Sequence, residues 1–160
     1  MINLTNNVSP VAKANLFLLV FAGFCLLIAL AIAWMLGITL FFPNGAIASH
    51  IVERADIIRA HIDYLMMSQF LFIFFLLFKQ FAIKAPAWVV FACCFGAFFN
   101  PLAFLNRGFS PKPDPALLIG VEPHFPLMAG VSFTLTTVGF LSCVGLVIFT
   151  ILKNQRTQSS

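Results

Sequence analysis

The sequence predicts an all-α membrane protein, a polytopic bundle of four transmembrane helices that forms one domain over residues 1–160. The first reason is composition, because 61% of the residues are hydrophobic and the mean hydropathy is +1.03. A water-soluble domain of this length cannot bury so much apolar surface. The second reason is pattern: the apolar runs are long and unbroken, whereas membrane β-barrels alternate in segments of about ten residues. The net charge of +4 is small and scattered, which gives no basis for nucleic-acid binding.

The first apolar run predicts a helix over 14–42, ended by the turn residues Pro43, Asn44 and Gly45. This run is longer than the roughly 15 residues of a secretory signal core, and no clear small-residue cleavage site follows it. We therefore expect a retained membrane helix. The 44–56 connection carries charged residues at helical spacing in its second half, which is an alternative start for the next helix.

The next two apolar runs predict helices over 57–78 and 85–105. The link between them is short and contains Lys79, Lys84 and Pro86. Because so short a connection joins antiparallel neighbours, we expect these two helices to form a hairpin.

Turn residues at 106–108 and a Pro-rich connection lead to the last expected helix, 127–152. Charge then predicts the orientation of the bundle, since cytoplasmic connections of membrane proteins carry an excess of Lys and Arg. One side of the expected bundle has basic residues without acids, and the other side mixes both signs. We therefore expect both termini in the cytoplasm, beside the basic set Lys13, Lys79, Lys84, Lys153 and Arg156.

The helix expected over 57–78 opens with three ionisable residues, Arg59, His61 and Asp63, in an otherwise apolar segment. Each such group costs about 2.5–3.5 kcal/mol at the centre of a spanning helix, so it is seldom placed there without a partner or a function. His61 and Asp63 lie on opposite faces, and Arg59 is the nearest intrahelical partner of Asp63. Because neither face suits lipid, we expect neighbours all round and hence an oligomer. For His61 three uses stay open: helix packing, metal or haem ligation, and proton relay.

The histidines, the cysteines and the absence of several motifs limit the kinds of functional site that the sequence supports. The chain has three histidines, and the other two, His50 and His124, fall in expected connections. It contains no Cys-x-x-Cys-His pattern for covalently attached haem, no His-Glu-x-x-His pattern of zinc proteases and no Gly-rich phosphate loop. The four cysteines all lie in apolar runs, where we expect them to pack in the core.

Polar residues are expected to gather in the outer half of the bundle. Counting from Lys79 at 1.5 Å per residue places His61 about 27 Å away, just inside a hydrocarbon core about 30 Å thick. The same count from the start of the next helix places Asn100 at about 22 Å. Threonines within 134–137 reach a similar depth from the last helix. We therefore expect any site to be shallow and to open outward or sideways.

Two blocks of the sequence resemble styrene oxide isomerase, a family of small four-helix bacterial membrane enzymes. The first block is Arg59-Ala60-His61 at the start of a helix, and the second is 100–104 followed by Phe109-Ser110-Pro111. The likeness extends to chain length and to the order of the four helices. The resemblance implies a multi-pass protein of the bacterial inner membrane.

The resemblance also implies a cofactor and a reaction. The family forms homotrimers that hold b-type haem between adjacent subunits, with one histidine as the axial ligand of each iron. His61 stands at the ligand position. In the family, ferric iron acts as a Lewis acid on the epoxide oxygen of a hydrophobic substrate, and ring opening with a hydride shift gives an aldehyde or ketone. A Phe-rich pocket reached from the lipid bilayer would suit such a substrate and exclude water.

Three positions depart from the family pattern. Phe104 stands where the family has a pocket tyrosine, Met67 where it has an asparagine, and Gly96 where it has an aspartate. Phe104 and Met67 are therefore expected beside the cofactor without polar groups to orient an epoxide. Tyr64, the one tyrosine of the chain, could supply a catalytic phenol instead, or it could be an interfacial anchor.

The remaining candidates lie near the outer mouth. Arg59, Arg54 and Arg107 are expected to hold haem propionates, or else to pair with the acids of the boundary. Asn100 is expected to take a catalytic pocket role, or else to bend its helix ahead of Pro101. Two other functional classes stay open: a haem protein for electron transfer or ligand sensing, and a haem-free structural membrane subunit.

Overall fold

The computed structural model describes residues 13–111 and 126–158. The described chain is helical and contains no strand. Four of its helices are long and apolar enough to cross a membrane, which confirms the predicted all-α membrane bundle. The expected polar start, the Pro-rich connection and His124 lie outside the described residues. The helices are α1 (Lys13–Phe41), α2 (Ala46–His50), α3 (Arg54–Gln80), α4 (Ala87–Phe109) and α5 (Leu127–Gln158).

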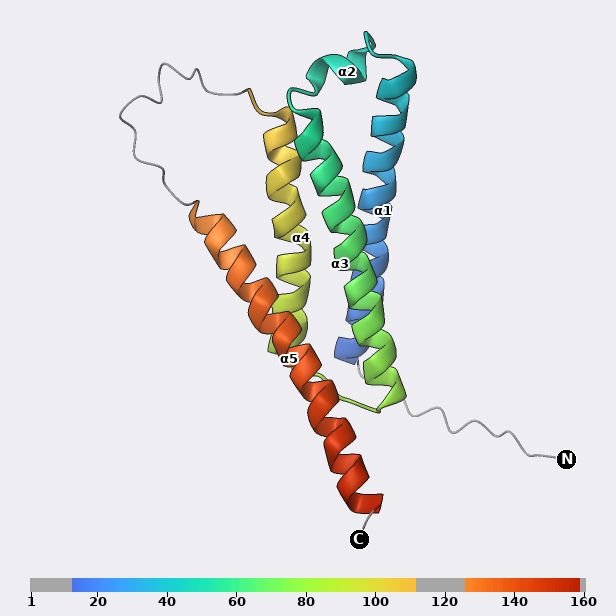
Figure 1. Ribbon diagram of the computed structural model, residues 1–160, viewed down its shortest axis with the longest axis vertical. Helices are drawn as coiled ribbons and strands as arrows, with labels where there is room; N and C mark the ends of the chain where they lie inside the picture. Colours follow the sequence, from blue (N-terminus) through green and yellow to red (C-terminus); the bar gives the residue numbers. More distant parts are fainter. Residues whose placement is uncertain (1–12, 112–125, 159–160) are drawn as a thin grey trace, which may run out of the picture.

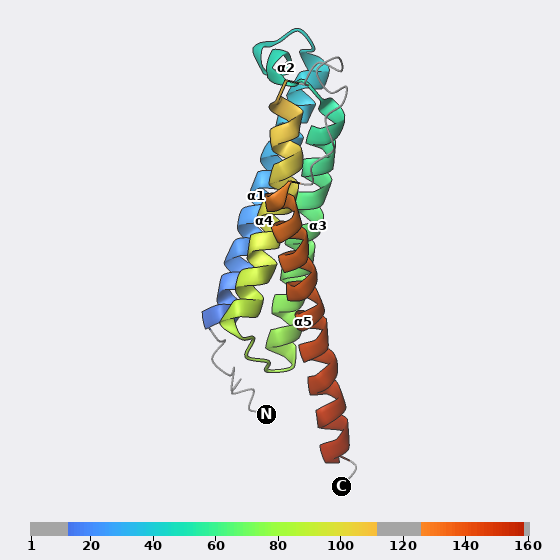
Figure 2. The same cartoon turned by 90° about the vertical axis from the view of Figure 1, so that its left-hand side faces the viewer.

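Helices α1, α3 and α4 form the compact part of the bundle, and α5 lies obliquely against α4 (Figure 1). The contacts between α1 and α3 are the most extensive, whereas α1 and α4 touch much less. In the view turned by 90°, α5 runs beyond the ends of the other helices (Figure 2). The start of α1, the α3–α4 link and the end of α5 therefore lie at one end of the molecule, and α2 lies at the other.

The start of α3 differs from the main expectation. The helix begins at Arg54 rather than at 57, because the side chain of Glu53 caps it by accepting a hydrogen bond from the Ala55 amide at 3.3 Å. The alternative start in the charged half of the connection is thus confirmed. The short helix α2 was not predicted.

The ends of α4 and α5 also extend beyond the predicted bounds. Helix α4 continues through Pro101 to Phe109. Its last turn is held by the Gly108 carbonyl, which accepts hydrogen bonds from the amides of Val52 and Glu53 at 2.9 and 3.0 Å. A Cβ atom on Gly108 would clash with the side chain of Ile57 unless that side chain moved, so glycine permits this close approach.

The basic end of the bundle is closed by one buried side chain. Asn15 of α1 donates from Nδ2 to the carbonyl of Ile83 at 2.7 Å and accepts from the Ala85 amide at 3.4 Å. These bonds join α1 to the link of the predicted α3–α4 hairpin. All four cysteines are buried and unlinked, with Sγ of Cys93 and Cys143 3.5 Å apart, which confirms their expected packing role.

Candidate functional site

His61 lies on the side of α3 that faces α1, and the contact fixes its tautomer. Its Nδ1 is 2.9 Å from the carbonyl oxygen of Ala29, inside α1. A carbonyl oxygen only accepts, so Nδ1 carries the proton, and in the neutral ring Nε2 keeps its lone pair. The side chain is half-buried. The neutral ring with its proton on Nδ1 is the state in which a histidine binds a metal ion through Nε2, because the backbone acceptor at Nδ1 fixes the ring.

Arg54 lies on the same line of contact between α1 and α3, which we call the α1–α3 seam. Its Nη1 donates to Oγ1 of Thr39 at 2.7 Å and its Nη2 to the carbonyl of Leu36 at 3.2 Å. Seven residues separate Arg54 from His61, which is about 10 Å along one face of the helix. The seam therefore presents an imidazole nitrogen and, two turns away, a cation.

Asp56 gathers the other two arginines on the opposite side of α3, toward α4. Its carboxylate is 3% exposed and lies 3.0 Å from Nη1 of Arg59 and 3.2 Å from Nη2 of Arg107. Arg59 therefore pairs with Asp56. The spacing along the helix had suggested Asp63 as its partner instead. For Asp63 the described residues contain no hydrogen bond or ion pair. The boundary pairing that sequence reasoning offered as the alternative to propionate binding accounts for Arg59 and Arg107.

The Asp56→Asn variant should be less stable than the wild type. The carboxylate is buried between two guanidinium groups, and hydrogen bonds to charged groups contribute about 1.5–3 kcal/mol each. We expect the free energy of unfolding in detergent to fall by about that amount, measured by chemical denaturation. Arg59→Gln removes one exposed partner and should cost only about 0.2–1 kcal/mol. Equal costs for both changes would contradict the central position of the carboxylate.

Tyr64 points away from the α1–α3 seam. Its hydroxyl donates to the carbonyl oxygen of Phe98 on α4 at 3.1 Å, and the side chain is only 1% exposed. The expectation of an interfacial anchor is therefore wrong, because the ring lies inside the bundle. His61 and Tyr64 are one turn apart on α3 but contact different helices. The catalytic role expected for Tyr64 stays a prediction.

Asn100 joins α4 to α5. Its Nδ2 donates to Oγ1 of Thr136 at 2.8 Å, and its Oδ1 accepts from Oγ of Ser132 at 2.5 Å. Thr136 in turn donates to the Ser132 carbonyl. Polar groups of two helices thus meet as expected, but away from His61. Ser132 was missed, although its spacing of four residues from Thr136 was a signal that could have found it.

The two expected pocket residues with altered chemistry lie in different parts of the core. Met67 packs against the larger core cluster, which contains the inner halves of the helices. Phe104 packs against the smaller cluster near the outer end, and the guanidinium of Arg107 lies 5.8 Å from its ring centre. A Cβ atom on Gly96 would lie 2.8 Å from Cα of Thr136, so this position serves the close contact of α4 with α5.

An apolar groove lies where α1 and α4 diverge, with a volume of about 290 Å³. Its walls are phenylalanine rings and one thiol. Phe98 stacks on Phe24 with ring centres 6.0 Å apart and contacts Tyr64 edge-on at 6.3 Å. We call this the Phe groove; it consists of Phe17, Phe21, Phe24, Phe91, Cys94, Phe95, Phe98 and Phe99.

The described ranges contain no group of three or more His, Cys, Asp or Glu side chains that could hold a metal ion. A haem needs only one axial protein ligand, so His61 alone meets that requirement. The fold and the seam define a multi-pass helical membrane protein with a half-buried histidine at the contact of two of its helices. Comparison with protein-family models, with curated proteins and with solved structures found no match for this chain.

Proposed function

We propose that this protein binds b-type haem through Nε2 of His61 and isomerises hydrophobic epoxides. The observation that carries the proposal is the 2.9 Å contact between Nδ1 of His61 and the Ala29 carbonyl. It holds the ring in the tautomer that leaves Nε2 open to an iron atom. The contact also orients the ring without using a charged partner, which would raise the cost of burial in a membrane.

The residues of the seam fit a haem. Haem carries two propionates that need cations at the membrane edge, and Arg54 supplies one on the same helix face as His61. Arg59 and Arg107 pair with the Asp56 carboxylate on the other side of α3, whereas Arg54 donates only to neutral oxygens, so Arg54 is the better propionate partner. The half-exposed position of His61 leaves room for a planar group on the outside of the seam.

When bound, ferric haem supplies a Lewis acid for an epoxide oxygen. The substrate and product are isomers, because one ring C–O bond breaks, a hydride moves to the adjacent carbon and a C=O bond forms. No oxidant, reductant or water is consumed, and water would divert the reaction to a diol. The chain contributes exclusion of water through its Phe-rich interior, and the Phe groove offers an apolar substrate a route from the bilayer.

A homotrimer with haem between subunits is part of the proposal. His61 is half-buried within one chain, although a haem ligand needs a dry surround on the side of Nε2. A second copy against the α1–α3 seam would supply it. The proposal places the trimer in a bacterial inner membrane with both termini in the cytoplasm.

A second candidate is a haem protein for electron transfer or ligand sensing, without isomerase activity. Two sets of contacts favour it. The hydroxyl of Tyr64 donates to the Phe98 carbonyl, and the side-chain amide of Asn100 donates to Thr136 and accepts from Ser132. Both side chains that could orient an epoxide thus have structural partners. Reversible reduction and gas binding without epoxide turnover would identify this class.

The reaction is tested with the purified protein and a panel of aryl and alkyl epoxides. We expect haem-loaded wild type to form carbonyl isomers, detected by gas chromatography, with no diol. If Tyr64 orients substrate, Tyr64→Phe should lower kcat about 10- to 100-fold with the Soret band intact. Unchanged kcat would restrict Tyr64 to helix packing. A haem-loaded wild type that converts no epoxide would favour the second candidate.

A further inference from the structure

The last turns of α5 form a cationic and apolar face, and every described residue that lines it belongs to α5 itself. The helix has 32 residues, which corresponds to about 48 Å and exceeds a hydrocarbon core about 30 Å thick. Cys143 contacts Cys93, six residues after the start of α4 at Ala87. The antiparallel α5 therefore extends beyond the first residue of α4 soon after position 149. Figure 1 shows this projection.

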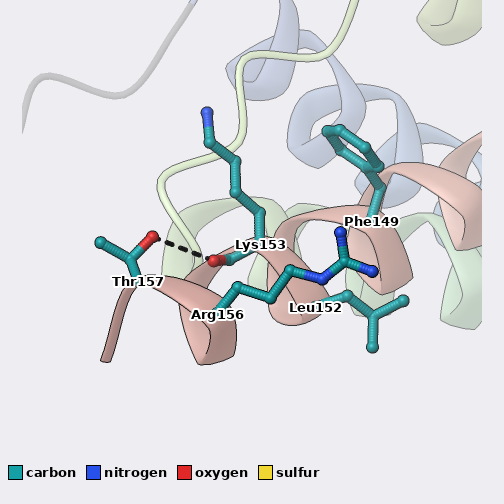
Figure 3. Close-up of a pocket in the computed structure, with 5 residues that line it drawn as sticks. All are labelled: Phe149, Leu152, Lys153, Arg156 and Thr157. Carbon is teal, nitrogen blue, oxygen red and sulfur yellow. Dashed lines mark hydrogen bonds between the residues drawn. The ribbon is translucent and has the colours of Figure 1, made fainter. Parts of the chain in front are cut away.

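One face of this projection is a shallow hollow of about 540 Å³ (Figure 3). The residues that line it follow helical spacing, so they all come from one side of α5. We call them the α5 end face: Phe149, Leu152, Lys153, Arg156 and Thr157. Phe149 is 68% exposed and lies about one turn before Lys153, and Leu152 is 51% exposed and lies about one turn before Arg156.

The order of chemistry along this face matches a phospholipid. Apolar side chains come first, at the level of acyl chains, and cations follow at the level of phosphates. Figure 3 shows the Arg156 side chain lying back along the helix toward Phe149 and Leu152, while Lys153 extends in another direction. The backbone carbonyl of Lys153 accepts from Thr157 at 3.1 Å, which keeps the last turn helical.

The charges of the whole end complement an anion. The other cations at this end of the molecule are Lys13, Lys79 and Lys84, on α1, α3 and the link. Among described residues, the acids Glu53, Asp56 and Asp63 all belong to the first half of α3 or its cap, toward the opposite end. The described acidic side chains therefore lie toward the end of the molecule opposite to the α5 end face.

We infer that the α5 end face binds an anionic phospholipid, with an acyl chain along Phe149 and Leu152 and the phosphate at Lys153 and Arg156. A soluble anion would not explain the two exposed apolar side chains on the same face. The inference is independent of haem, because the seam residues His61 and Arg54 form their hydrogen bonds with α1 and not with α5.

The test is native mass spectrometry of the full chain in detergent, titrated with phosphatidylglycerol or phosphatidylcholine of equal chain length. We expect the wild type to prefer phosphatidylglycerol. Each cation near a lipid surface contributes about fivefold in affinity, so Lys153→Gln with Arg156→Gln should lower that preference about 25-fold. Circular dichroism should be unchanged, because these side chains are exposed.

The matched control removes two other cations from the same end, as Lys79→Gln with Lys84→Gln. We expect it to keep most of the preference, since these residues are not on the α5 end face. Equal losses in both double variants would overturn the site and leave general attraction to a basic end. Phe149→Ala with Leu152→Ala should weaken both lipids alike, and unchanged binding of both would overturn the acyl contact.

Discussion

The His61→Ala variant is expected to be purified without the Soret absorption band that the proposed haem would give the wild type. The imidazole is the only side chain in the α1–α3 seam that presents a nitrogen lone pair, because the Arg54 guanidinium can only donate. Without an axial ligand, haem would be held by apolar contacts and one cation. We expect a haem affinity weaker by more than about tenfold, because losing even an outer-shell partner of a metal ligand costs roughly 10–100-fold.

Two measurements distinguish a specific loss of haem from a loss of the fold. His61 makes one hydrogen bond to Ala29, and such interhelical bonds contribute on average about 0.6 kcal/mol in membranes. The variant should therefore keep its helical circular dichroism. His50→Ala is the matched control, since His50 is exposed in α2 and should keep the full band.

The other outcomes have distinct meanings. A Soret band of equal strength in wild type and His61→Ala would assign the iron to another ligand. No band in either protein, even after haem is supplied during purification, would remove the haem proposal. The protein would then be a structural membrane subunit in which His61 joins α3 to α1.

The elements were predictable because a bilayer leaves few alternatives for an apolar chain. All four long helices were found from hydropathy, and the hairpin of α3 and α4 from its short link. The start of α3 was predicted least accurately, because Glu53 extends the helix by a local cap that hydropathy does not reveal. Helix α2 was missed for a similar reason, since five residues have no periodicity to detect.

The candidate site was only partly predictable. Arg54 and His61 lie seven residues apart on one helix face, and both form hydrogen bonds with α1. Spacing along the helix did not show which neighbour each polar group would meet, because that depends on how the helices are rotated and paired. Tyr64 forms its hydrogen bond with α4 and Asn100 forms its bond with α5, whereas His61 contacts α1. The preference of Arg59 for Asp56 over Asp63 has the same origin, since Arg107 of α4 draws the carboxylate into a shared cluster.

The Gly139→Ala variant is expected to separate α5 from α4 and to destabilise the bundle. A Cβ atom at Gly139 would lie 2.8 Å from the backbone nitrogen of Cys93 and 3.1 Å from the backbone carbon of Ala92. Backbone atoms of a helix cannot move aside singly, so the two helices must part. Overpacking of this kind costs about 1–3 kcal/mol. We expect a lower thermal unfolding temperature in detergent for this single methyl group.

Gly145→Ala makes the same chemical change on the same helix without the clash. A Cβ atom there meets nothing within 4 Å. Alanine favours a helix over glycine by about 1 kcal/mol, so this control should be neutral or slightly stabilising. The opposite signs of the two variants would attribute the loss to the α4–α5 contact rather than to α5 itself. Similar unfolding temperatures for both would mean that α4 and α5 do not approach this closely, and would also weaken the Asn100 contact with Ser132 and Thr136.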